Sequence, residues 1–222
     1  MNNSSPPPTT AIFDTLRRCA GLAGIIGGIA LAAAYLAHPP NAPPETVASA
    51  RWIAIHVGFM VSLISGVFLL MALLGQYLRC GGGMAGFIGF AMAIISLIFV
   101  FGLDYAEVFI FPTLAIEFPE VIKRYGDGTA MPSIAFAFPL TGLLFVAGFI
   151  VFSWQLYRTK AVMRGASLLT IIGTIVFGIG LSGLVPMIIV RAGAVLFGAG
   201  LIWLGISLWA RTPSGGSGRI TR

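Results

Sequence analysis

The hydrophobic positions of this chain form long continuous runs, separated by short polar stretches. Several runs exceed the ~18 to 20 apolar residues that a helix needs to cross a bilayer. They do not alternate between apolar and polar positions, as the strands of a membrane β-barrel do. The pattern predicts an all-α membrane protein, a six-transmembrane-helix bundle with spans at residues 19–37, 52–75, 84–111, 134–157, 165–185 and 192–210.

The polar stretches predict a single membrane domain, residues 19–211, between two flexible cytoplasmic tails. Residues 1–18 are rich in proline and residues 212–222 in glycine and serine, compositions typical of unstructured segments. An alternative is that residues 1–34 form a cleaved signal peptide, with three alanines at its end. The first apolar run is long enough to stay as an anchor, which favours a span. The connections 38–51 and 113–133 are expected to form a small outer cap.

Composition supports the membrane class and narrows the partners. Hydrophobic residues make up 58% of the chain and charged residues 9%, whereas soluble domains have roughly a quarter charged residues. The net charge of +6 could indicate a nucleic-acid partner. However, the basic residues stand singly or in small groups at the ends of apolar runs, where they anchor spans. The expected partners are therefore the lipid bilayer and other membrane proteins, including further copies of the chain, and not nucleic acid.

The distribution of lysine and arginine predicts the orientation. Cytoplasmic segments of membrane proteins carry an excess of these residues. With both termini in the cytoplasm, nine basic residues are inside and four outside, which predicts a multi-pass protein of a prokaryotic cytoplasmic (inner) membrane. The inner set is Arg17, Arg18, Arg79, Arg158, Lys160, Arg164, Arg211, Arg219 and Arg222, and the outer set is Arg51, Lys123, Arg124 and Arg191.

Two sequence patterns concern helix packing. The segment QYLRCGGGMAG at 76–86 resembles QLYRTKAVMRG at 155–165, which indicates either an internal duplication or two similar hairpin turns. Small residues also recur four positions apart, a spacing that lets helix backbones approach closely. These residues form either a dimerisation face or contacts inside one bundle, and the second interpretation is favoured. They are Gly24 and Gly28 in the first span, and Ala194 and Gly198 in the last.

One polar cluster is predicted near the outer surface. Asp104 and Glu107 are three positions apart and share a helix face, about 30 Å along a helix that starts at Met84. His56 lies at the outer end of the preceding span, so all three residues should have a similar depth. They could pair with Arg51 or Arg191 as a structural lock, carry a proton or a divalent cation, or be solvated. The spacing matches no metal motif, so no metal is assigned.

Cofactor and catalytic signals are weak. A haem held by His38 and His56 is disfavoured, because loop histidines seldom provide fixed axial ligands. Cys19 and Cys80 form no C-x-x-C motif, so a zinc or iron–sulfur site is not expected. The serines of the spans have no histidine at their depth to activate them. No cofactor and no catalytic residue are predicted.

Three functions follow in order of preference. The first is a non-catalytic accessory or structural subunit of a larger membrane complex, supported by the small-residue faces. The second is a small ion- or proton-coupled transporter that uses His56, Asp104 and Glu107. The third is a redox or quinone-linked membrane subunit, for which only His38 and His56 could supply ligands.

Overall fold

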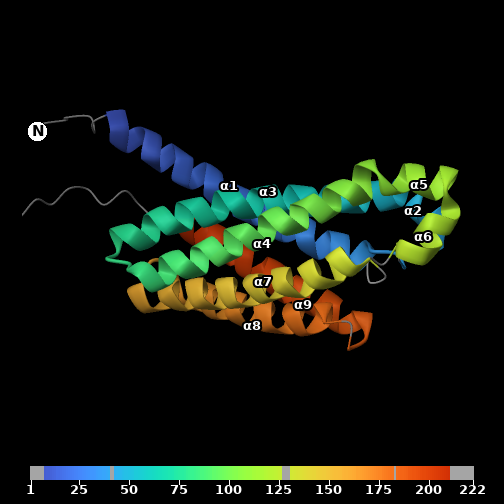
Figure 1. Ribbon diagram of the computed structural model, residues 1–222. Coiled ribbons are helices and arrows are strands. Elements are labelled where there is room, and N and C mark those ends of the chain that lie inside the picture. The colour runs from blue at the N-terminus through green and yellow to red at the C-terminus, as the bar shows by residue number, and fades with distance from the viewer. Residues whose placement is uncertain (1–7, 41–42, 127–130, 183, 211–222) are drawn as a thin grey trace, which may run out of the picture.

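The computed structural model describes residues 8–40, 43–126, 131–182 and 184–210, and this part of the chain is helical, without strands (Figure 1). Six of the helices are long and apolar enough to cross a membrane, which confirms the predicted all-α, six-span class. The helices are α1 (Pro8–Ala37), α2 (Pro44–Val47), α3 (Ala50–Arg79), α4 (Met84–Phe109), α5 (Phe111–Glu117), α6 (Pro119–Tyr125), α7 (Pro132–Thr159), α8 (Arg164–Leu181) and α9 (Met187–Trp209).

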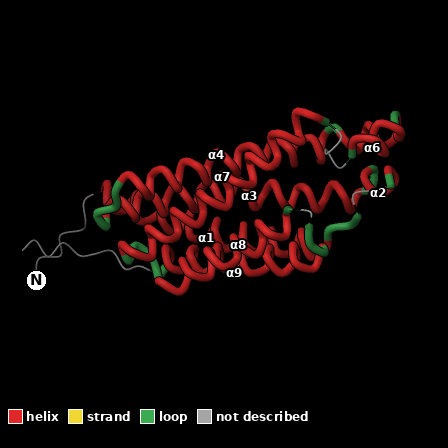
Figure 2. The backbone as a smooth tube through the Cα atoms, turned by 60° about the horizontal axis from the view of Figure 1, so that its bottom comes forward, coloured by secondary structure: helices red, strands yellow, loops and turns green. Residues whose placement is uncertain are grey.

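The six long helices form a closed ring. Each packs mainly against two neighbours, in the order α1, α3, α4, α7, α8, α9 and back to α1, and Figure 2 shows them running side by side. Only weak contacts join α3 to α7 and α9 across the middle. A ring of this kind has an axis, and the side chains that point towards it decide whether the interior is filled or hollow.

The two ends of the bundle differ in construction (Figure 1). The turn end carries the short α3–α4 and α7–α8 turns, together with the start of α1 and the end of α9. The cap end carries the short helices α2, α5 and α6, which are built from the two connections predicted to form an outer cap. A small separate core holds this cap together, made of Val47, Trp52, Ala115 and Ile122. The lysine and arginine count still predicts that the turn end faces the cytoplasm.

The two turns at the turn end are built alike. Gly81 and Lys160, 79 positions apart (160 − 81 = 79), both have left-handed backbone conformations, with φ of 77° and 53°. Such a residue typically ends a helix. The hydrogen bonds that follow correspond as well: Gly82 N–H donates to the Tyr77 carbonyl at 3.0 Å, and Ala161 N–H donates to the Leu156 carbonyl at 3.1 Å. The sequence similarity of 76–86 and 155–165 therefore reflects a shared turn geometry.

The helix at the N-terminus is longer than predicted. The span was expected to begin at residue 19 after a flexible tail, whereas α1 begins at Pro8. Proline is tolerated in the first turn of a helix because its missing N–H would have no partner there. Arg17 extends the contact with α9: its guanidinium donates to the carbonyl of Leu208 and lies 3.4 Å from the carboxylate of Asp14. Residues 1–7 and the predicted tail 212–222 lie outside the described residues.

The third span is interrupted near its end. Residues 84–111 were predicted as one span, but α4 ends at Phe109 and α5 begins at Phe111. Pro112 explains the break, since its ring would clash with the carbonyl of Val108 and it has no N–H to donate. The last two spans also differ from their predicted bounds of 165–185 and 192–210: α8 ends at Leu181 and α9 begins at Met187, so Arg191 lies inside α9.

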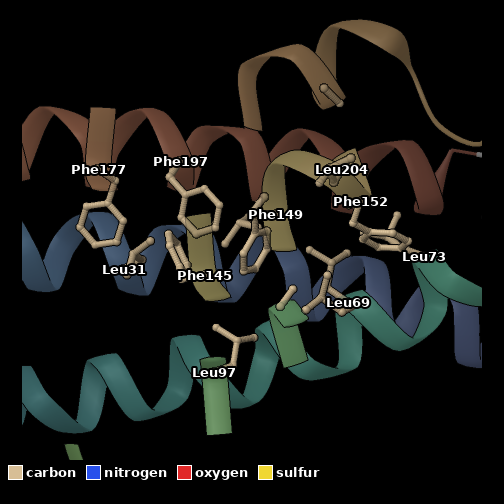
Figure 3. Packing of buried hydrophobic residues seen from close by; sticks show 14 of the residues in the cluster. Leu31, Leu69, Leu73, Leu97, Phe145, Phe149, Phe152, Phe177, Phe197 and Leu204 are labelled. Atoms are coloured by element: carbon tan, nitrogen blue, oxygen red, sulfur yellow. The ribbon is translucent and has the colours of Figure 1, made fainter. Parts of the chain in front are cut away.

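Small residues bring the helices of this bundle together. Gly28 in α1 and Gly198 in α9 face each other so closely that a methyl group on Gly198 would lie 2.6 Å from the Gly28 carbonyl oxygen. A methyl group on Gly24 would lie 2.9 Å from Leu69, and Ala194 is fully buried. These faces are packed inside one bundle. The large side chains fill the space beside them, and Figure 3 shows leucine and phenylalanine from different helices interlocking.

Candidate functional site

A cavity of about 380 Å³ lies on the ring axis in the cap half of the bundle, and all six long helices line it. Its walls are mostly apolar. Ligand pockets of proteins are commonly apolar cavities of roughly 300 to 1,000 Å³ with a few polar groups. The polar and titratable side chains among the lining residues are Tyr35, His38, His56, Ser62, Asp104 and Glu107.

The two acids of α4 point inwards. Asp104 is only 8% exposed, and Glu107 is half-buried one turn further along the same face. Neither forms an ion pair, because the ion pairs of the described residues are Arg17–Asp14 and Lys123–Glu120. The lining residues include no lysine or arginine. The cavity therefore has two carboxyl groups and no described cationic side chain to balance them.

The indole of Trp52 is a hydrogen-bond donor next to the carboxyl group of Glu107, although the two atoms lie outside the geometry of a regular hydrogen bond. The carboxyl Oε2 of Glu107 is buried without a hydrogen-bond partner, and so is the indole Nε1 of Trp52. Trp52 is held at the start of α3, where the hydroxyl of Ser49 accepts from its backbone N–H at 3.2 Å. Buried polar groups normally have partners, so unpaired ones at the edge of a cavity mark a place where a bound molecule can supply them.

The two histidines meet at the cap end. The Nδ1–H of His56 donates to the Trp52 carbonyl at 2.9 Å, and the Nδ1–H of His38 donates to the Pro39 carbonyl at 2.7 Å. Their rings are 5.2 Å apart, edge to face. Because Nδ1 carries the hydrogen, Nε2 of a neutral ring is an acceptor. Burial lowers the pKa of His38, the hydrogen bond to Pro39 opposes that shift, and the charge of Arg191 adds to it.

The arginines suggested as ion-pair partners contact backbone carbonyls instead. Arg51 donates to the Ala37 carbonyl at 2.7 Å, and Arg191 donates to the His38 carbonyl at 3.2 Å. Both thus bind the C-terminal end of α1, where carbonyls lack helical partners and attract cations. The predicted lock between these arginines and Asp104 or Glu107 is not formed in this structure.

The positions of the histidine, cysteine and acidic side chains are relevant to the metal ion and the haem considered from the sequence. Within the described residues no group of three or more histidine, cysteine or acidic side chains is placed to hold a metal ion. The axial ligands of a bis-histidine haem lie on opposite sides of the iron. The rings of His38 and His56 contact each other directly and would have to separate to admit a porphyrin.

Aromatic rings form much of the cavity wall. Phe145 and Phe149 of α7 pack edge to face on Phe197 of α9, with ring centroids 5.2 Å and 4.9 Å apart. Tyr35 packs on Phe59 with centroids 4.6 Å apart. Phe138 of α7 is 47% exposed, whereas the other lining residues are buried or half-buried.

Sequence reasoning found part of this site. It placed His56, Asp104 and Glu107 at one level, and all three line the cavity. It considered His38 only as a haem ligand and did not identify Tyr35, Trp52 or the phenylalanine wall. Tyr35 and His38 are three positions apart at the end of a helix, a spacing that could have indicated a shared face.

Comparisons of the chain with protein-family models, with curated proteins and with solved structures found no match. Its class is therefore defined by its own architecture, a multi-pass membrane protein with six helices around a hollow axis.

Proposed function

We propose that this protein binds a small amphipathic molecule in the axial cavity. The apolar part of the molecule lies among the phenylalanine rings, and its polar group lies against Asp104, Glu107 and His56. The observation that carries the proposal is the cavity itself, which is lined by all six long helices and has on its wall two acids that form no ion pair among the described residues.

This proposal differs from the accessory subunit that the sequence favours. A subunit that serves only to pack needs no interior space, because voids cost stability by roughly 24 cal/mol per Å³. A cavity of about 380 Å³ is more space than packing alone explains, which supports a binding role. The transporter considered as the second function would also begin by binding its substrate. The proposed binding site therefore uses the same residues, His56, Asp104 and Glu107.

Photoaffinity labelling in lipid nanodiscs tests the proposal. The probe is a neutral phenylalkanol that carries a diazirine, with phenylhexanol as the unlabelled competitor. We expect saturable labelling that maps to lining segments of α4 and α7 and is removed by excess competitor. Labelling that does not saturate, or that is spread over lipid-facing positions, would overturn the proposal.

A matched pair of valine variants checks the location. Val100 lines the cavity, so Val100→Trp should fill part of it and reduce labelling affinity by about tenfold. Val61 is 41% exposed and does not line the cavity, so Val61→Trp should leave labelling unchanged. Equal effects of the two variants would contradict binding on the axis.

A further inference from the structure

We infer that the ligand of this cavity is a lipophilic amine in its cationic form, with the ammonium group held by Asp104 and Glu107. This inference rests on the proposed function and names the chemical class of the ligand. Three features of the cavity support it: the charge of the lining residues, their hydrogen-bond capacity, and the aromatic composition of the walls.

The described lining residues of the cavity include two acids and no basic side chain to balance them. Asp104 and Glu107 lie on one face of α4, and the described residues place no lysine or arginine among the lining side chains. The nearest candidates, Arg51 and Arg191, are engaged with the carbonyls of Ala37 and His38. A carboxylate removed from water needs a cationic partner or a proton. A cationic ligand supplies such a partner where the protein does not.

Hydrogen-bond capacity points the same way. Among the described residues neither Asp104 nor Glu107 forms an ion pair, Glu107 Oε2 is fully buried, and the donor next to it is the indole of Trp52, outside regular hydrogen-bond geometry. The His56 ring uses Nδ1 to donate to Trp52, which leaves Nε2 as an acceptor. A carboxylate accepts hydrogen bonds only, while a primary ammonium has three donors and no acceptor. The polar end of the cavity is thus rich in acceptors and suits a ligand rich in donors.

The walls suit the rest of such a molecule. Phe59 of α3 and Phe145 and Phe149 of α7 are buried rings of the cavity wall, and Tyr35 packs on both Phe59 and Phe177. Aromatic faces attract cations, by about 0.5 to 2 kcal/mol each depending on solvent exposure, and also provide apolar contact. An uncharged polar ligand would use the apolar walls but would leave the two acids without a cation.

A series with one apolar part and three head groups provides the test. Phenylhexylamine, phenylhexanol and phenylhexanoate are each used to compete with the neutral photoaffinity probe in nanodiscs of zwitterionic lipid. We expect the amine to compete at least about tenfold more strongly than the alcohol, which corresponds to ~1.4 kcal/mol, and the carboxylate to compete least. An alcohol that competes as strongly as the amine would overturn the inference while leaving the proposed function intact.

Isosteric amide variants assign the preference to the acids. Asp104→Asn should bring the amine-to-alcohol ratio close to one, and Glu107→Gln should reduce it less, because Glu107 is more exposed. Glu117→Gln is the matched control: Glu117 is exposed on α5 outside the cavity, so the ratio should not change. Retained labelling by the neutral probe shows that each variant is folded. A ratio unchanged in both amide variants would overturn the inference, whereas absence of saturable labelling by the neutral probe in the unmodified protein would overturn the proposed function.

Discussion

The turn end and the cap end of this bundle are made from the same six helices but are packed differently. At the turn end, Leu73, Leu156 and Leu208 are completely buried, and Phe152 packs on Tyr77 and Phe90. The cap half instead contains the axial cavity. On α4, a methyl group on the buried Gly89 would collide with α7, whereas Gly102 lies on the exposed face and a methyl group there would meet nothing within 4 Å.

This contrast shows how one ring of helices can be both stable and hollow. Close packing supplies the contacts that hold membrane helices together, since lipid provides no hydrophobic drive between them. If the turn end supplies most of those contacts, the cap end can keep unpaired acids and open space. The stability of the protein and its proposed binding site then reside in different halves.

The largest expected effect is loss of a ring at the turn end. Phe152→Ala should reduce the free energy of unfolding by about 3 to 5 kcal/mol, because the side chain is 1% exposed and the surrounding helices cannot collapse fully into the gap. Thermal and denaturant unfolding in detergent would measure this loss. Phe138→Ala, at the 47% exposed ring that lines the cavity, should cost less than about 1 kcal/mol. Similar losses of unfolding free energy in Phe152→Ala and Phe138→Ala would contradict the difference in packing between the two ends.

A smaller effect is expected from adding one methyl group to α4 at either end. In Gly89→Ala the new atom would lie 2.7 Å from the Phe152 backbone nitrogen, so α4 and α7 must move apart at a cost of about 1 to 3 kcal/mol. Gly102→Ala is the matched control and should be neutral or stabilising by up to about 1 kcal/mol, since alanine is the better helix former. The same unfolding measurements apply. A destabilising Gly102→Ala would mean that the outer face of α4 at this residue is packed more closely than the structure shows.

The fold was predictable because each span carries its own signal. Apolar length, breaking prolines and terminal arginines identified six helices and the cap connections without knowledge of their packing. The boundary error at the start of α1 has one local cause and one long-range cause. The helical residues 8–18 are polar enough to resemble a tail, and Arg17 is fixed by a carbonyl of α9 that lies far away in sequence.

The cavity was less predictable because it depends on how six helices are rotated about their axes. Asp104, Glu107 and His56 could be placed at one level by counting residues along antiparallel spans. Whether they face lipid, an arginine or the axis depends on contacts such as those of Gly89 and Gly148 between α4 and α7. The phenylalanine wall gave no signal, because phenylalanine in a membrane span occurs on lipid-facing surfaces as well as inside.

The smallest expected effect is a pH dependence that belongs to the cap end alone. Burial lowers the pKa of His38, and nearby Arg191 adds to that shift, so the unfolded chain binds a proton at His38 more readily than the folded chain does. The stability due to neutral His38 is therefore complete above the ordinary histidine pKa of about 6.5 and is lost as the pH falls through the lower pKa of the folded state.

Unfolding temperatures measured from about pH 7 down to about pH 5 should fall more steeply for the unmodified protein than for His38→Gln. Phe152→Ala should lower the whole curve without changing its slope, because the rings that pack on Phe152 are those of Tyr77 and Phe90, neither of which is a histidine or a carboxyl group. If the unfolding temperatures of the unmodified protein and of His38→Gln fall equally with pH, His38 is not the source of a pH dependence at the cap end.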